Sequence, residues 1–219
     1  MKAFIRNFLS SLRFGARLLL LIYALSFPLA KLGQVTHSFD LYDWLALSPA
    51  LVWKGEVWGL ATYAFLGSGL LDWAVSLFWL ATLLGIVGRN WSTRFLWSYC
   101  LLAAITSGLV ITIGRPRMQD SIMSNSAITY ALLAAWYRLQ GHERVLLLGL
   151  GEVSVRYAAI GLALLQALVS FYSGGGVFLT LALMSGGVAG WFYLWLRDKY
   201  ALSRRSQVVD SDRISRLEL

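Results

Sequence analysis

The chain alternates between long apolar runs and shorter polar stretches. A helix that crosses the hydrocarbon core of a membrane needs about 20 mostly apolar residues. We expect spans at about 14–32, 69–87, 95–113, 125–137, 157–172 and 177–196. The fourth and fifth are short, which is tolerated where a helix begins inside a bundle and is shielded from lipid. Because no small-residue cleavage site follows the first run, we expect a retained helix rather than a signal peptide.

Three connecting segments have a character of their own. The segment 33–68 is long and rich in aromatic residues, and we expect Trp44, Trp53, Trp58 and Tyr63 to lie at the membrane interface. The segment 140–156 contains the apolar stretch VLLLGLGEVSV, which fits either an interfacial helix or a strand-like structure. Residues 200–219 are polar and are expected to form a flexible tail. The predicted organisation is a basic N-terminus (1–13), a membrane domain (14–199) and this tail.

Composition supports a membrane protein. Of the 219 residues 58% are hydrophobic and 14% are charged, which excludes an ordinary water-soluble globule. Six crossings of about 20 residues would use nearly all of these roughly 127 apolar residues. The single cysteine, Cys100, excludes an internal disulfide framework and a multi-thiolate metal site. With only His37 and His142 present, histidine chemistry is also scarce. We therefore expect no metal and no cofactor.

The basic residues predict the orientation. Cytoplasmic loops of membrane proteins carry an excess of Lys and Arg, and with the N-terminus inside, 15 of the 19 basic residues fall on the cytoplasmic side. Both ends are then cytoplasmic. Because the basic residues are dispersed over every inner segment, the net charge of +8 does not indicate nucleic-acid binding. The other four residues are Lys31, Lys54, Arg115 and Arg117.

Strongly polar residues within the predicted spans are few, and each is a candidate for function because a polar group in lipid is costly. Asp72 lies near the start of the second span, with Ser76 one turn later on the same face. Asp72 either complements the helix dipole or takes part in binding. The fourth span opens with Ser124, Asn125 and Ser126, for which helix capping is a sufficient explanation.

Small residues predict how two of the spans pack. The sixth span carries Ser185, Gly186, Gly187 and Gly190, a spacing that lets two helix backbones approach closely. The fourth span carries alanines on one face. We expect these two faces to pack together.

Three segments together resemble the rhomboid family of intramembrane serine proteases. LALSPALVWKGEVWGLATYAFLGSGLLDW is similar to the family's first loop and second helix, SNSAITYALLAAW to the helix that begins at the nucleophile, and SGGVAG to the glycine-rich sixth helix. The resemblance covers about residues 40–196 and implies a six-helix membrane bundle. It places Ser126 at the nucleophile position, and it implies helix packing through Ala127, Tyr130, Ala131, Gly186 and Gly190.

The sequence departs from that family at the residues that perform the chemistry. A serine hydroxyl needs an adjacent base to become a nucleophile, and the position of the family's histidine is Leu183. The two positions that would stabilise the oxyanion are Asp72 and Ser76, and a carboxylate there opposes developing negative charge. The resemblance therefore implies a vestigial Ser126 that survives as a helix cap.

Three functions remain open at this stage. The first is an inactive rhomboid-like protein of a bacterial inner membrane that binds or stabilises the transmembrane segments of other proteins. The second is an active intramembrane protease in which Asp72, with a pKa raised by burial, replaces the histidine. The third is a structural subunit of a larger membrane complex; a small-solute carrier is disfavoured because paired intramembrane charges are lacking.

Overall fold

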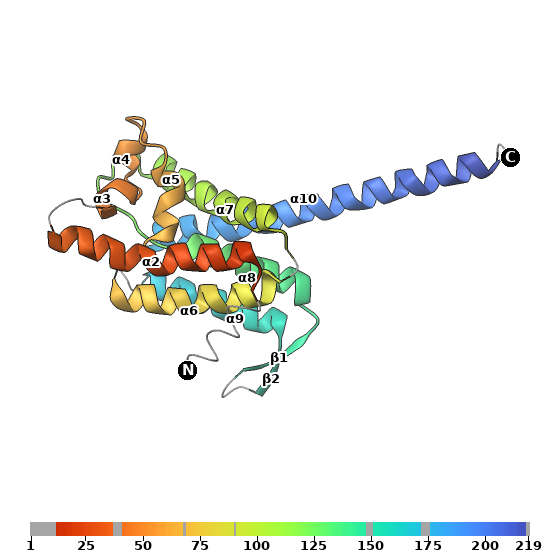
Figure 1. Cartoon of the computed structure of the whole chain (residues 1–219), viewed down its shortest axis with the longest axis horizontal. Helices are drawn as coiled ribbons and strands as arrows, with labels where there is room; N and C mark the ends of the chain where they lie inside the picture. Colours follow the sequence, from red (N-terminus) through yellow and green to blue (C-terminus); the bar gives the residue numbers. More distant parts are fainter. Residues whose placement is uncertain are drawn as a thin grey trace.

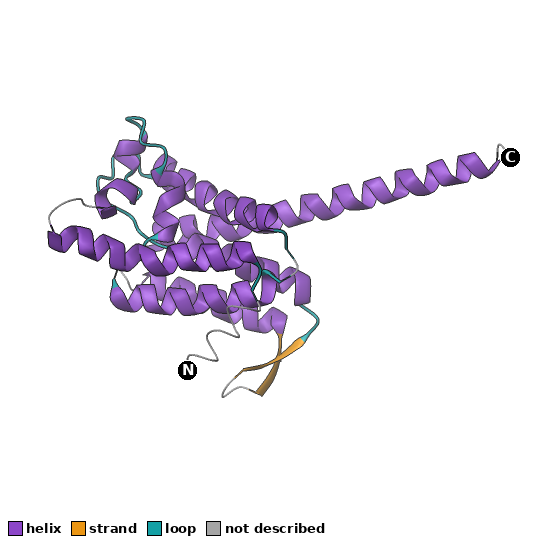
Figure 2. Cartoon of the chain, in the orientation of Figure 1, coloured by secondary structure: helices purple, strands orange, loops and turns teal. Residues whose placement is uncertain are grey.

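The computed structural model describes residues 12–36, 41–67, 69–89, 91–147, 151–171 and 176–217. Each predicted span lies on a helix (Figures 1 and 2). The helices are α2 (Phe14–Thr36), α6 (Leu70–Val87), α7 (Thr93–Gly114), α8 (Ser126–Gln140), α9 (Val155–Ser170) and α10 (Gly176–Leu217). In the described part of the chain, α2, α7 and α10 are long and apolar enough to cross a membrane, while α6 and α9 are shorter apolar helices. The expected helical membrane protein is confirmed.

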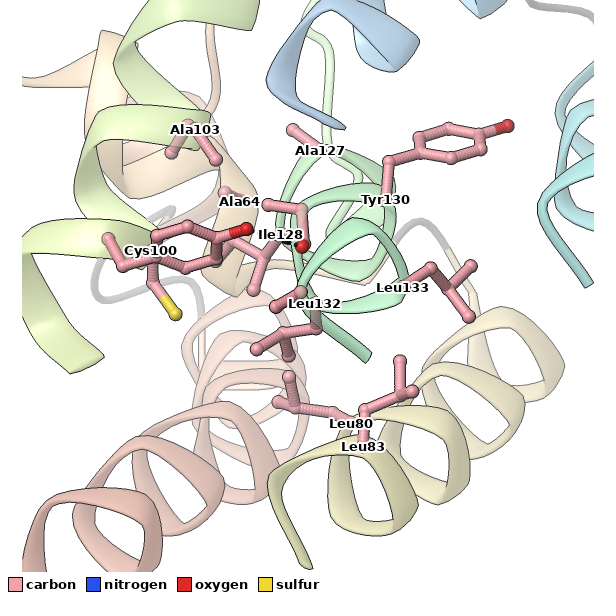
Figure 3. Packing of buried hydrophobic residues seen from close by; sticks show 14 of the residues in the cluster. Ala64, Leu80, Leu83, Cys100, Ala103, Ala127, Ile128, Tyr130, Leu132 and Leu133 are labelled. Atoms are coloured by element: carbon pink, nitrogen blue, oxygen red, sulfur yellow. Dashed lines mark hydrogen bonds between the residues drawn. The ribbon is translucent and has the colours of Figure 1, made fainter. Parts of the chain in front are cut away.

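Helix α8 lies at the centre of the bundle and packs against α6, α7, α9 and α10. All residues from Ser126 to Leu133 are buried, as are Ala135 and Trp136. Figure 3 shows Leu132 and Leu133 on the side of α8 that faces Leu80 and Leu83 of α6, while Ile128 lies near Ala64. A helix enclosed by other helices need not match the thickness of the hydrocarbon core, which explains why its apolar run is short.

Small residues bring α10 close to α8 and α7. A Cβ atom added to Gly186 would lie 2.9 Å from the Ala127 carbonyl oxygen and 2.8 Å from Ser107 Oγ. One added to Gly190 would lie 2.5 Å from the Tyr99 hydroxyl, and that hydroxyl donates to the Ala131 carbonyl at 2.6 Å. The glycine face of α10 thus lies directly on the alanine face of α8.

The long connection after α2 folds over the end of the bundle where α8 begins. It contains α3 (Leu41–Leu45), α4 (Pro49–Val52), α5 (Gly59–Thr62) and the 3-10 helix η1 (Tyr63–Phe65). Leu47 and Ile122 exchange backbone hydrogen bonds of 3.0 and 2.9 Å. Trp44, Trp53 and Trp58 are exposed, but Tyr63 is fully buried and donates to the Ala104 carbonyl at 3.2 Å. The interfacial position expected for Tyr63 is therefore wrong.

Basic residues gather at the opposite end of the bundle. Arg13, before α2, donates to the Trp91 carbonyl beside the start of α7 at 3.1 Å. Arg138, near the end of α8, pairs with Asp198 of α10 at 3.1 Å.

The segment between α8 and α9 adopts the strand-like alternative: β1 (Arg144–Leu147) and β2 (Gly151–Ser154) form an antiparallel hairpin in which Arg144 faces Ser154.

Helix α10 is longer than the sequence predicts. The expected span ends near residue 196 and a polar tail was expected from residue 200, but the helix extends to Leu217 (Figure 1). The tail sequence has no proline or glycine that would end a helix, and its Ala, Arg, Leu and Gln residues are good helix formers.

We predict that Gly186→Ala destabilises the protein by about 1–3 kcal/mol, because the new methyl group meets backbone that cannot move aside cheaply. Gly161→Ala is the matched control, since a Cβ at Gly161 has nothing within 4 Å and alanine favours the helix. Thermal unfolding of the purified protein in detergent measures both. Equal shifts for the two variants would contradict the close packing of α10 on α8.

Candidate functional site

The candidate nucleophile lies at the buried start of α8. Ser126 is 4% exposed and is the first residue of the helix, so it is not the helix cap that the sequence predicted. Asn125 occupies the cap position, but its side chain makes no capping hydrogen bond. Ser124 Oγ instead accepts from the Ser126 backbone N–H at 3.2 Å. Ser124 is held in turn by its own N–H, which donates to the Tyr63 carbonyl at 3.3 Å.

The hydroxyl of Ser126 receives hydrogen bonds from two side chains. Ser124 Oγ donates to it at 2.9 Å, and Gln166 Nε2 of α9 donates to it at 2.9 Å. An amide N–H is a donor and cannot take up a proton. The groups bound to Ser126 therefore hold its oxygen in place without activating it as a nucleophile.

Leu183 presents hydrocarbon where the resemblance implies a base. Its side chain is buried, and its backbone carbonyl accepts from Ser107 Oγ at 3.2 Å. Ser107 also lies 3.4 Å from Ser185 Oγ, so hydroxyl groups tie this turn of α10 to α7. The polar groups near Leu183 thus serve helix packing, and none of these three residues is a general base at neutral pH.

The structure places Asp72 and Ser76 beside Tyr23 of α2. Asp72 lies in the first turn of α6 and is partly exposed, whereas Ser76 is buried. It is Gln166, rather than either of these residues, that donates to the Ser126 hydroxyl. Asp72 and Ser76 therefore belong to the contact between α6 and α2, whereas Ser126 belongs to the contact between α8 and α9.

The remaining reactive residues lie elsewhere. His142 is exposed at the basic end, where its Nε2 accepts from Arg156 at 2.7 Å, and His37 lies outside the described residues. Cys100 is fully buried in the core of α7. Within the described ranges no three His, Cys, Asp or Glu side chains are grouped so that they could hold a metal ion.

Sequence reasoning missed Gln166. It is the one strongly polar residue among the apolar residues 157–169, and such a residue in a membrane helix is a functional candidate by default because it needs a partner. The same argument that selected Asp72 could have selected it. The sequence does not reveal that Ser126 is its partner, because the two residues are 40 positions apart in the chain.

Comparison with known families assigns the chain. The family described as Eukaryotic integral membrane protein (DUF1751) matches residues 13–204, and the chain belongs to it. No curated protein matches the sequence significantly. The family match overturns the expected location in a bacterial inner membrane, since the family is one of eukaryotic integral membrane proteins. The basic loops indicate which side of a membrane is cytoplasmic, but they do not identify the membrane.

We predict that Ser126 and Gln166 are energetically coupled. In a double-mutant cycle, Ser126→Ala and Gln166→Ala should show a coupling of about 0.6 kcal/mol and at most about 1.7, as for other hydrogen bonds between membrane helices. Unfolding free energies in detergent provide the measurement. Thr82→Ala on α6 replaces Gln166→Ala in the control cycle, because the Thr82 hydroxyl bonds within its own helix at 2.9 Å and should add independently.

Proposed function

We propose that this membrane protein is a rhomboid-like scaffold without protease activity, and that it binds or stabilises transmembrane segments of other membrane proteins. The proposal includes six crossings, with both chain ends in the cytoplasm. It is supported by the three rhomboid-like segments, by the gathering of basic residues at one end, and by the departures at the catalytic positions.

The observation that carries the proposal is the hydrogen bonding of Ser126. An active serine needs a base that accepts its proton, but here two donors are directed at its oxygen. Loss of an oxyanion donor costs on the order of 100-fold or more in rate, and loss of the base removes most of the remaining activation. Leu183 and Gln166 together favour a structural role for Ser126.

Helix α9 offers the surface on which a client segment would bind. Its buried residues, Val155, Ala158 and Ala159, all lie in its first five residues. Beyond them Leu164 and Leu168 are 62% and 55% exposed. The second half of α9 is thus weakly packed, and the hydrogen bond from Gln166 to Ser126 ties it to α8. A client span would pack on this half or take its place.

A structural subunit of a larger complex is the second candidate, and the same exposed apolar face favours it. The two roles differ in how long the partner protein stays bound. A client exchanges, whereas a subunit partner stays bound in stoichiometric amount and is purified with the protein. The partner's stoichiometry after purification therefore distinguishes them.

We predict no reaction at Ser126 with a serine-directed activity probe, and no cleavage of a fluorescent transmembrane substrate after reconstitution. Labelling that is lost in Ser126→Ala would overturn the proposal. Cleavage that is lost in Asp72→Asn would instead support the active protease with Asp72 as its base.

We also predict that a photo-crosslinking residue at Leu164 or Leu168 captures apolar spans of other proteins in native membranes. Leu25 of α2, which is 46% exposed, is the matched control for a lipid-facing leucine. Sequencing of the crosslinked peptides identifies the partner segment. Equal capture from Leu25, or crosslinks to lipid alone, would contradict a client surface on α9.

A further inference from the structure

A groove runs between α8, α9 and α10 at the basic half of the bundle. Its volume is about 470 Å³. One face of α8 forms the floor through Tyr130, Leu133, Ala134 and Tyr137, whose spacing of three and four residues places them in line. Ala163 of α9 and Val188 of α10 are among the residues that line the walls. The lining is almost entirely apolar.

Two guanidinium groups lie at the basic end of this groove. Tyr137 and Trp191 line that end, and their ring centroids are 5.5 Å apart. Arg138 lies over the Trp191 ring at 5.1 Å, and Arg156 lies over the Tyr137 ring at 6.0 Å. The apolar groove thus opens directly beneath two cations.

The charges around this opening leave a positive excess. Asp198 is paired with Arg138 at 3.1 Å and also lies 3.5 Å from Arg197. Arg156 lies 2.7 Å from the Nε2 atom of His142, which carries no negative charge. Each guanidinium has five N–H donors, so one partner leaves donors for an anion. Arg138 and Arg156 therefore outnumber Asp198 at this opening.

We propose that the groove binds an anionic phospholipid, with one acyl chain between α9 and α10 and the phosphate against Arg138 and Arg156. Basic pockets between membrane helices on the cytoplasmic side recognise such headgroups. The groove is too small to enclose a helical span. One turn of a helix about 10 Å across already fills about 420 Å³, and a span has several turns. A flexible hydrocarbon chain fits this volume.

The headgroup half of the proposal is tested by native mass spectrometry of the detergent-purified protein with added dioleoyl lipids. Phosphatidylserine should bind more tightly than phosphatidylcholine with the same chains. Arg156→Gln should weaken phosphatidylserine binding by about fivefold, as expected for one basic contact with an anionic lipid. Arg144→Gln is the matched control, since Arg144 lies on the nearby hairpin, outside the groove, with a 75% exposed side chain.

The acyl-chain half is tested by filling the groove. Ala163→Leu should reduce binding of both lipids, whereas Ala74→Leu, on an exposed position of α6, should leave binding unchanged. Unfolding temperatures of both variants confirm that each is folded. Equal binding of the two lipids, equal loss in Arg144→Gln and Arg156→Gln, or unchanged binding in Ala163→Leu would overturn the proposal. Failure of the client proposal would leave these results unaffected.

Discussion

The burial of α8 is the constraint on which the rest of the structure depends. A helix with neighbours on every side can be enclosed only if some of them approach its backbone closely, and the small residues of α10 allow this approach. Gly186 and Gly190 lie against Ala127 and Ala131, and the hydroxyl of Tyr99 reaches the α8 backbone from α7. Lipid tails are as apolar as leucine side chains, so helices in a membrane gain no energy of association from the exclusion of water. Close packing and hydrogen bonding must supply that energy instead.

This constraint also determines what Ser126 can do. A hydroxyl at the buried start of α8 needs partners, since an unpaired polar group away from water is costly. Ser124, fixed by the Tyr63 carbonyl, supplies one partner, and Gln166 supplies the other. Neither of these two partners is a base, and the described residue at the position of the family's histidine is the buried Leu183. The same position that could hold a nucleophile therefore holds a contact between α8 and α9.

The positions of the helices could be predicted because run length and hydropathy act locally along the chain, and α2, α6, α7 and α9 begin or end within a few residues of their expected limits. The sequence did not decide whether the segment after α8, which forms the hairpin, is helix or strand. A short apolar run fits both structures until its pairing is known. Gln166 was missed because its role depends on a contact between helices. The bacterial location was wrong because charge bias reports sidedness alone, and the family match was needed to correct it.

Both proposed surfaces depend on the uneven packing of α9. Val155, Ala158 and Ala159 bury its basic end against the bundle, where Arg156 stands over Tyr137. Its other half holds to α8 through Gln166 and exposes leucines to the membrane. A lipid bound at the basic end adds contacts to the part of α9 that is already fixed, and so leaves the opposite half free to exchange partners. The two surfaces meet near the middle of the helix, where Ala163 lines the groove and the neighbouring Leu164 is exposed.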